Sequence, residues 1–323
     1  MSEAIVVKPR RLGVLGTLVQ DTIHHPGASR PIRDWGGIAY ALAALDAVLP
    51  PGWTLVPVIK VGRDLFAEAS AYLHTFARIG DMALVRRVPE PNNRVELFYS
   101  TPADRTEILS GGVPGWSPGE LADVLPTLDA LYVNLIAGWE LDLAGAHRIR
   151  DDFAGPTYVD LHSLFLDMPG GGHRQPRRLP REEDWAGCFD TVQMNRDEFA
   201  LFAGGEHPGV VEEALAARAA RIIVTLGADG VDIMTATGPR RAVETEHVPV
   251  PAGPAPGDPT GCGDIWGSTF FASLLGGAGT HAAIARAHGM ARKKLGSSGP
   301  DAFRDSLAAD ASSHRSPGLR TPS

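Results

Sequence analysis

The chain lacks several features that would point to a particular class of protein. Its 323 residues include 2 cysteines, Cys188 and Cys262, which are too few and too far apart for a disulfide framework. Charges and prolines interrupt every apolar run before it reaches the roughly 18 residues of a membrane span, and Met1 to Arg10 has no apolar signal core. The net charge of -8 argues against a general binder of nucleic acid or membrane surfaces. We therefore expect a cytoplasmic protein without nucleic-acid or membrane partners.

The order of the predicted elements favours an α/β fold. Apolar runs typical of buried strands occur at 12–16 and 53–61, and helical apolar spacing follows them at 38–49 and 64–78. Farther along the chain, predicted strands and helices alternate as far as a last helix at 282–294. Repeated alternation of this kind predicts a mostly parallel sheet that is covered by helices on both faces.

Some segments do not fit this layer. Short strands separated by polar turns are predicted near 22–31 and at 85–88, 94–99 and 106–109. Residues 310–323 are rich in Ser, Pro and Arg, a composition typical of a disordered tail. These short strands therefore lie outside the predicted main sheet, and strand spacing alone does not indicate their role.

The segment from Gly257 to Asp264 reads Gly-Asp-Pro-Thr-Gly-Cys-Gly-Asp and precedes a mostly apolar helical run. Glycines on both sides of Cys262 let several N–H groups point outward at the start of a helix, whose dipole adds partial positive charge. These residues predict a site for a phosphate or an oxyanion. Asp264, in the first helical turn, could accept a proton from a hydroxyl that attacks the anion. The alternative is a capping turn in which Asp264 faces solvent.

This string resembles the C-terminal signature D-T-x-G-A-G-D of the ribokinase, or PfkB, family of carbohydrate kinases, with Pro259 and Cys262 at two positions where Thr and Ala are commoner. The resemblance implies a ribokinase-like three-layer α/β sandwich with a mostly parallel central sheet and a small β-sheet lid. It implies one domain over residues 11–309, lid segments near 19–35 and 84–110, and a disordered tail at 310–323.

The resemblance also implies an activity, which is ATP-dependent phosphorylation of a hydroxyl on a sugar or sugar-containing small molecule. The backbone of Gly261, Cys262 and Gly263 would form the anion hole, and Asp264 would be the general base. No G-x-x-x-x-G-K-[ST] string occurs in the sequence, which disfavours a P-loop kinase.

Three positions match the family's sugar-binding residues. Asp21 follows the first strand, where a carboxylate can accept hydrogen bonds from neighbouring hydroxyls. Gly36 and Gly37 match the double glycine near the lid hinge, although the Asn that follows it in the family is missing. Arg105, in the predicted lid, could reach an anionic group of the substrate, and the alternative is a solvated lid charge.

Asn195 and Glu198 match the family's N-x-x-E, which organises Mg²⁺ and its water shell near the phosphates. Residues three apart on a helix share a face, and Mg²⁺ prefers oxygen ligands and keeps several waters, so a carboxylate can act through water. The alternative is a capping box at the start of a helix, and the two roles are compatible.

Thr225, Gly227 and Gly230 resemble the family's T-x-G-x-x-G nucleotide loop. A strand–turn–strand hairpin needs similar residues and is the alternative. Asp258, the first acid of the signature, is grouped with this set of cofactor-binding residues. ATP and Mg²⁺ are the implied cofactors, and the resemblance leaves a monovalent cation open.

Several questions remain open at this point. A nucleoside kinase of the same fold and a non-catalytic sugar- or nucleotide-binding protein are the two alternative functions. The family resemblance also raises a homodimer formed through the lid. The long connection at 162–184 contains Arg174 and three further arginines and could gate the site or contact phosphates, although a solvated loop is favoured. The histidines show no metal-ligand spacing and are interpreted as structural or surface residues.

Overall fold

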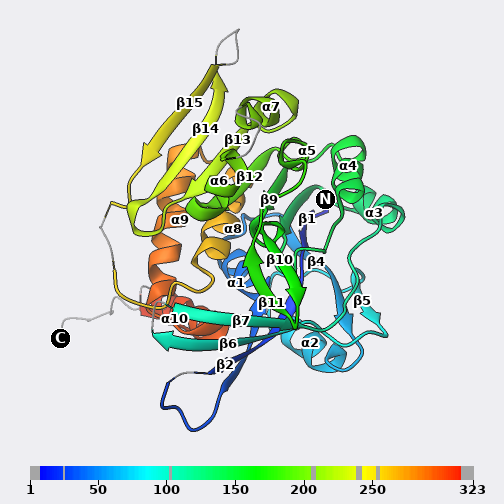
Figure 1. Ribbon diagram of the computed structural model, residues 1–323, viewed down its shortest axis with the longest axis vertical. Coiled ribbons are helices and arrows are strands. Elements are labelled where there is room, and N and C mark those ends of the chain that lie inside the picture. The colour runs from blue at the N-terminus through cyan, green and yellow to red at the C-terminus, as the bar shows by residue number, and fades with distance from the viewer. Residues whose placement is uncertain are drawn as a thin grey trace, which may run out of the picture.

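A nine-stranded sheet runs through the centre of the computed structural model (Figure 1). The structure describes residues 8–24, 26–101, 104–204, 209–237, 242–251 and 255–313. In spatial order the strands are β15 (Ala242–Val248), β14 (Val231–Thr237), β13 (Arg221–Thr225), β12 (Thr191–Asn195), β9 (Thr157–Asp160), β8 (Ala130–Asn134), β1 (Arg10–Leu15), β4 (Trp53–Gly62) and β5 (Val85–Val88). Strand β14 is antiparallel to both of its neighbours, and all the other pairs are parallel. The prediction of a mostly parallel sheet is confirmed.

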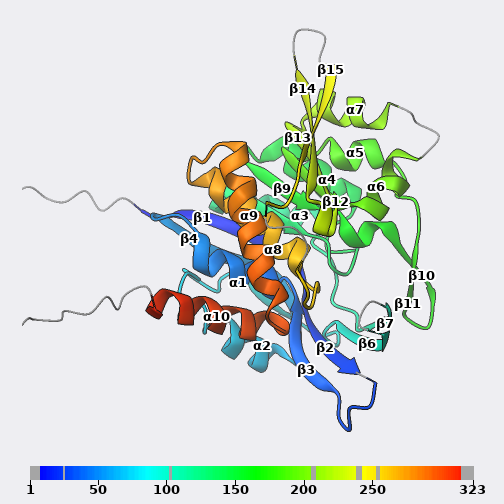
Figure 2. The same ribbon diagram turned by 90° about the vertical axis from the view of Figure 1, so that its left-hand side faces the viewer.

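Helices cover both faces of this sheet (Figure 2). One face carries α1 (Ala39–Val48), α2 (Phe66–Leu73), α8 (Cys262–Leu275), α9 (Thr280–Leu295) and α10 (Gly299–Ser313). The other carries α3 (Pro118–Val124), α4 (Leu143–Asp152), α5 (Glu182–Ala186), α6 (Arg196–Ala203) and α7 (Val210–Ala217). Every residue of the central strands β8 and β9 is buried, as a sheet covered on both faces requires. The result is a three-layer α/β sandwich.

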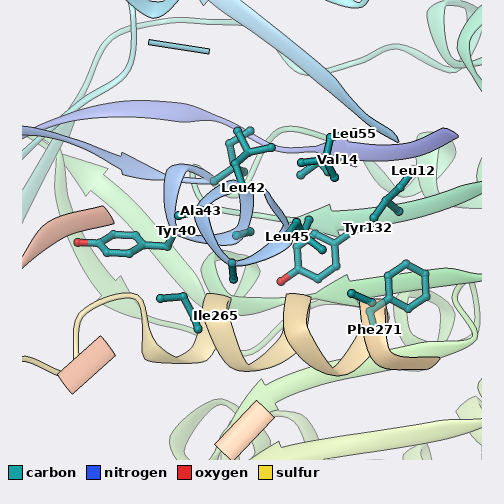
Figure 3. Packing of buried hydrophobic residues seen from close by; sticks show 14 of the residues in the cluster. Leu12, Val14, Tyr40, Leu42, Ala43, Leu45, Leu55, Tyr132, Ile265 and Phe271 are labelled. Atoms are coloured by element: carbon teal, nitrogen blue, oxygen red, sulfur yellow. The ribbon is translucent and has the colours of Figure 1, made fainter. Parts of the chain in front are cut away.

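Helix α1 packs against both the sheet and helix α8, which itself contacts β8 and β9 (Figure 3). Its residues 39–45 are all buried, because they are apolar around the whole helix and neither side of the helix faces water. Leu42 packs toward Val14 and Leu55 of the sheet, and Ile265 of α8 approaches from the opposite side. Residues 265–273 of α8 are likewise all buried. This double packing fixes the N-terminus of α8 beside the carboxyl ends of the parallel strands.

A second sheet of six strands forms the predicted lid below the sandwich (Figures 1 and 2). Its spatial order is β10 (Leu166–Gly170), β11 (His173–Pro176), β7 (Asp104–Ser110), β6 (Arg94–Thr101), β2 (Leu18–His24) and β3 (Ile32–Gly37). Val19, Val95, Leu97 and Leu109 form a small apolar cluster on this sheet together with Ala137 of the main layer. The lid therefore has its own core and is attached to the sandwich through that cluster.

Two predicted lid boundaries differ from the structure. The sequence predicts lid strands from residue 84 onward, but 85–88 form β5, which pairs parallel with β4 at the edge of the large sheet. Residues 166–176, predicted to belong to a solvated connection, instead form β10 and β11 and extend the lid through the pairing of β11 with β7. Both differences arise from pairing with distant strands, which local sequence does not specify.

The C-terminal boundary also differs. The sequence predicts a last helix at 282–294 and a disordered tail from residue 310, whereas α9 is followed by α10, which continues to Ser313. Phe303 of α10 is completely buried in the core that contains α1, so this helix is held by packing. Residues 314–323 lie outside the described residues. Over the ranges that the structure describes, no helix has the length and apolar content that crossing a membrane would need.

Candidate active site

A cavity of about 760 Å³ lies between the carboxyl edge of the large sheet and the lid. Asp160, Asn195 and Thr225 are the last residues of β9, β12 and β13, and all three line it. The carboxyl ends of parallel strands meet at one edge of a sheet, which is where ligands of α/β folds bind. The cavity is long enough to be lined at one end by the lid and at the other by β14 and α9. We refer to these as the lid end and the α9 end.

The signature turn lies between these two ends. Gly261 to Asp264 all line the cavity, and α8 begins at Cys262. Gly261 has φ +78°, and a Cβ there would come within 2.3 Å of the ring of Tyr40, so both its conformation and its packing require glycine. The N–H of Cys262 donates to the carbonyl of Pro259 at 3.0 Å. In this arrangement one of the three expected anion-hole donors is engaged within the turn itself.

The thiol of Cys262 is not ionised at neutral pH. Burial raises its pKa to about 11, and the carboxylates of Asp258 and Asp264 add to the effect, while the charge of Lys294 opposes it. The contribution of Cys262 to an anion hole would therefore come from its backbone rather than from a thiolate.

Asp264 is half-buried and is in contact with the end of a strand of the large sheet. The side-chain amide of Asn134, the last residue of β8, donates a hydrogen bond to Asp264 Oδ1. Burial raises the pKa of Asp264, and the hydrogen bond from Asn134 and the charge of His162 only partly oppose that rise. A carboxylate with a raised pKa is the stronger proton acceptor, so the site increases the basicity of this group.

A buried polar group around Gln193, which sequence reasoning did not single out, supports the turn. Gln193 of β12 donates from Nε2 to Asp160 Oδ2 at 2.7 Å and to the carbonyl of Gly263 at 3.2 Å, while Tyr158 donates to its Oε1. Burial raises the pKa of Asp160 well above its usual range, and the charges of Glu198 and Asp264 add to the effect. The sequence does contain one indication of such residues. Asn134 and Asp160 are each the last residue of a buried parallel strand, and this is the edge of the sheet at which ligands bind.

Asn195 and Glu198 form the capping box that the sequence allows. Asn195 Oδ1 accepts from the N–H of Glu198 at 2.9 Å, and Glu198 Oε2 accepts from the N–H of Asn195 at 2.8 Å. Both side chains also line the cavity, so capping and exposure to a ligand coexist. The remaining oxygen, Oε1, is 2.7 Å from Asn195 Nδ2 and 2.8 Å from His162 Nδ1.

His162 belongs to this cluster, although the sequence favours a structural or surface role for the histidines. Burial by itself lowers its pKa, but the hydrogen bond and charge of Glu198 outweigh that effect and raise the pKa to about 9. The imidazole is therefore positively charged at neutral pH and lies among Asp160, Glu198 and Asp264. It lines the cavity, and its ion pair with Glu198 is a contact that sequence spacing could not reveal.

The oxygen donors of this cluster fit Mg²⁺ through water. Both oxygens of Glu198 already accept hydrogen bonds, which leaves them suited to a water-mediated contact rather than to direct ligation. Burial raises the pKa of Asp160 and of Asp264, and the charge of the neighbouring Glu198 adds to both effects, so this group of acids favours a nearby cation. Within the described ranges, no group of three or more His, Cys, Asp or Glu side chains has the arrangement of a metal site by itself.

The α9 end is lined by the predicted nucleotide loop. Thr225 ends β13, and Gly227 and Gly230 follow in the turn to β14; all three line the cavity. The opposite wall is mostly apolar and is made by Val231, Val250, Ala291 and Leu295. Asp258, grouped with these residues from the sequence, is not part of this wall. Its carboxylate instead accepts from the N–H of Thr260 at 3.0 Å and faces Lys294.

At the lid end, Asp21 and the double glycine come together. Asp21 lies within β2, is 8% exposed and lines the cavity, as does Gly37. Gly36 on β3 pairs with Val19 of β2, and a Cβ at Gly36 would fall 2.0 Å from Asp21 Oδ2. Glycine at position 36 therefore leaves the space that the Asp21 carboxylate occupies. Arg105 lies on β7 opposite Tyr99, and its side chain is outside the part of the chain that the structure describes.

Arg174, from the β10–β11 hairpin, is an unexpected part of the lid end. Its side chain is 7% exposed, and it donates to Glu107 Oε1 at 3.1 Å and to the carbonyl of Ile136 at 2.9 Å. Arg174 and Glu107 both line the cavity, together with an apolar set made of Val19, Val95, Leu97 and Ile136. Arg174, which was predicted to belong to a solvated loop, is thus buried and connects the lid to the main layer. No local sequence pattern predicts this contact.

Comparisons with known proteins agree with this architecture. The family model described as pfkB family carbohydrate kinase matches residues 175–306, the part that contains the predicted nucleotide loop and the signature turn. No curated protein sequence matches the chain. The structural likeness extends over nearly the whole chain.

Three solved structures illustrate that likeness. Ribokinase from Thermotoga maritima has 17% identity and a TM-score of 0.70, covering 94% of this chain and 99% of that one. The nucleoside kinase of Burkholderia thailandensis, in complex with inosine, has 17% identity and a TM-score of 0.67, with coverages of 94% and 97%. Ribokinase from Arabidopsis thaliana, complexed with ribose and ATP, has 14% identity and a TM-score of 0.65, with coverages of 94% and 98%. These findings confirm the resemblance to the ribokinase, or PfkB, family and the ribokinase-like fold.

Proposed function

We propose that this chain, which has the ribokinase-like fold and whose residues 175–306 match the pfkB family of carbohydrate kinases, transfers a phosphoryl group from ATP to a hydroxyl of a sugar or sugar-containing small molecule. The observation that carries the proposal is the position of Asp264. It lies in the first turn of α8, beside Gly261 and Gly263, where the two ends of one cavity meet. An acceptor from the lid end and a donor from the α9 end would meet at this carboxylate.

The lid end is suited to a hydroxylated acceptor. The carboxylate of Asp21 can accept hydrogen bonds from two neighbouring hydroxyls, and the apolar wall around Val95 and Leu97 can cover the less polar face of a sugar ring or a base. The guanidinium of Arg174 is already engaged by Glu107 and by a backbone carbonyl. This favours a neutral acceptor over an anionic one.

The α9 end is suited to a nucleoside triphosphate. The turn at Gly227 and Gly230 would allow close approach of a ribose or phosphate, and the wall formed by Val231, Val250 and Leu295 would pack against a purine base. A donor that consisted of phosphate alone would leave this apolar wall unused. ATP would therefore fill more of the cavity than a donor that consists of phosphate alone.

Asn195, Glu198 and Asp160 would hold the water shell of Mg²⁺ next to the donor phosphates. When bound, Mg²⁺ supplies positive charge that shields those phosphates. His162 keeps Glu198 in place through its ion pair and adds a second positive charge on the same side of the cavity.

Asp264 would accept the proton of the attacking hydroxyl, a contribution that is typically about 10²–10⁴-fold in rate. Asn134 holds the carboxylate through a hydrogen bond to Oδ1, and Asp264 lines the cavity. The N–H groups at the start of α8 would stabilise charge on the transferred group, and losing one comparable donor costs about 3–4 kcal/mol in other enzymes. The lid would exclude water, which otherwise competes as acceptor.

A nucleoside kinase of the same fold is the second candidate. The apolar wall at Val19, Val95, Leu97 and Ile136 favours it, because a base attached to the acceptor sugar would need such a surface. The two candidates share every step at Asp264 and differ only in the acceptor.

The test is release of ADP from MgATP with a panel of sugars and nucleosides, using Asp264→Asn as the key variant. We expect one acceptor to stimulate ADP release in the wild type, and Asp264→Asn to lose at least about 100-fold in kcat while it still binds ATP in calorimetric titration. Asp123→Asn, which changes an exposed aspartate of α3, is the matched control and should retain full activity. Near wild-type turnover by Asp264→Asn would contradict the assigned base.

A further inference from the structure

Lys294, in the last turn of α9, carries a charge that is completely buried. Its side chain is 0% exposed, whereas the neighbouring Lys293 is 47% exposed and pairs with Asp310 on the surface. A buried ammonium is strongly unfavourable unless oxygen atoms replace its water shell. The contacts of Lys294 therefore indicate what this charge does.

Three oxygen atoms surround the ammonium. Nζ donates to the carbonyl of Ser297 at 2.8 Å, to the carbonyl of Asp258 at 3.2 Å and to Asp258 Oδ2 at 3.4 Å. It also lies 5.6 Å from the centre of the Tyr40 ring. The oxygens come from two segments, the start of the signature turn and the loop after α9. The ammonium joins these two segments.

This junction leads directly to the anion site. The N–H of Asp258 donates to the carbonyl of Leu295 at 3.1 Å, and Asp258 Oδ1 accepts from the N–H of Thr260 at 3.0 Å. Gly261, the next residue, packs against Tyr40, the same ring that covers the ammonium. The conformation of residues 257–261 thus depends on Lys294, although Lys294 does not line the cavity.

An ammonium and a monovalent metal ion satisfy such a site in the same way. Each has a single positive charge and binds carbonyl and carboxylate oxygens at about 2.8–3.2 Å, as the hydrogen-bonding range of the ammonium allows. The difference is that Lys294 is covalently attached and already in place. A carbonyl-lined site filled in this way has no need of an ion from solution.

We propose that Lys294 is a positioning residue that acts as a tethered monovalent cation and fixes the signature turn, so that turnover does not depend on K⁺ or a similar ion. The inference rests on the proposed kinase function for its activity readout, and a second readout does not depend on that function.

The experiment compares Lys294→Ala, which leaves room for a small cation, with Lys294→Met, which fills the space without charge. ADP release is measured with KCl or NH₄Cl against choline chloride at constant ionic strength. We expect less than about twofold dependence in the wild type, and a loss of about tenfold or more in both variants. NH₄⁺ or K⁺ should restore several-fold activity to Lys294→Ala but not to Lys294→Met. Lys293→Met is the matched control and should behave like the wild type.

Hydrogen–deuterium exchange supplies the readout that needs no substrate. The amide of Asp258 donates to the carbonyl of Leu295 in α9, and the amides of Thr260 and Cys262 donate to acceptors within the turn. Peptides covering 257–263 should therefore exchange faster in Lys294→Ala and slow again with NH₄⁺. A wild type that requires K⁺ by tenfold or more, or unchanged exchange and turnover in both variants, would overturn the proposal. If the wild type releases no ADP with any acceptor, the kinase proposal fails while the exchange result still decides the role of Lys294. If neither variant folds, the cation dependence of the wild type decides it.

Discussion

A single hydrogen bond to the proposed base illustrates how individual residues set the chemistry of this cavity. Burial raises the pKa of Asp264, while the amide of Asn134 lowers it by stabilising the ionised form. The net result is a pKa above that of an exposed aspartate, which makes the Asp264 carboxylate the stronger base. Removing the hydrogen bond from Asn134 should therefore change the pKa of Asp264 measurably.

Replacing Asn134 with alanine should therefore move the acid side of the pH–rate profile. Without the donor, the pKa of Asp264 rises further, so the ionised base is lost at a higher pH as the solution is acidified. We expect kcat/KM of Asn134→Ala to fall at a higher pH than that of the wild type, with the smallest loss at the alkaline end. The measurement is kcat/KM against pH, and an acid limb at the same pH in both proteins would contradict this account.

Some residues have two compatible roles, and the sequence indicated both of them for Asn195 and Glu198. The Asn195–Glu198 capping box is formed as spacing allows, and the same side chains reach the cavity because α6 begins at the carboxyl edge of the sheet. His162, which follows β9, adds an ion pair with Glu198, and Gln193 of β12 bonds to Asp160 of β9. Their roles depend on contacts 30 or more residues apart, such as the 36 residues between His162 and Glu198.

Among the elements, the β10–β11 hairpin changes the shape of the acceptor end. It extends the lid at its edge through pairing with β7 and inserts Arg174 between Glu107 and the backbone after β8. Breaking a buried ion pair by removing one partner leaves an uncompensated charge, here that of Glu107, beside the acceptor. The hairpin is thus predicted to act on acceptor binding more than on donor binding.

Arg174→Met tests that prediction. We expect KM for the acceptor to rise by about tenfold or more, which corresponds to about 1.4 kcal/mol, while the affinity for ATP changes little because the α9 end is untouched. Arg181→Met, in the same connection, alters an arginine whose side chain is 62% exposed and should leave both constants unchanged. Equal effects on acceptor and ATP would instead indicate general destabilisation.

For the whole molecule, the lid and the sandwich meet at the signature turn. The hydroxyl of Tyr99 on β6 is 3.3 Å from Thr260 Oγ1, a contact that joins the lid to the loop of the proposed anion hole. Closure of this kind excludes water from the transferred phosphoryl group. Through the same contact, the position of the lid affects the conformation of the signature turn.

Tyr99→Phe should weaken that coupling without removing the apolar wall. We expect ADP release in the absence of acceptor to rise relative to acceptor-stimulated release, by about threefold to tenfold, because loss of one hydrogen bond is worth about 0.5–1.5 kcal/mol. The ratio of the two rates in one preparation is the measurement. Thr22→Val, which changes another lid residue on β2, is the control, and an unchanged ratio in Tyr99→Phe would show that this contact does not control closure.

The sequence by itself determined the alternation of strands and helices, the signature turn and part of the cavity wall. Alternation of apolar strands and helices is a local pattern, and the turn from Gly257 to Asp264 needs only its own glycines and the helix that follows. Three features were decided only by tertiary structure. The pairing of β5 and of the β10–β11 hairpin, the Arg174–Glu107 link and the burial of Lys294 all depend on partners distant in the chain. The physical reason is the same for all three. An ion pair, a pair of hydrogen-bonded strands and a buried charge are each stable only when a distant part of the chain supplies the partner.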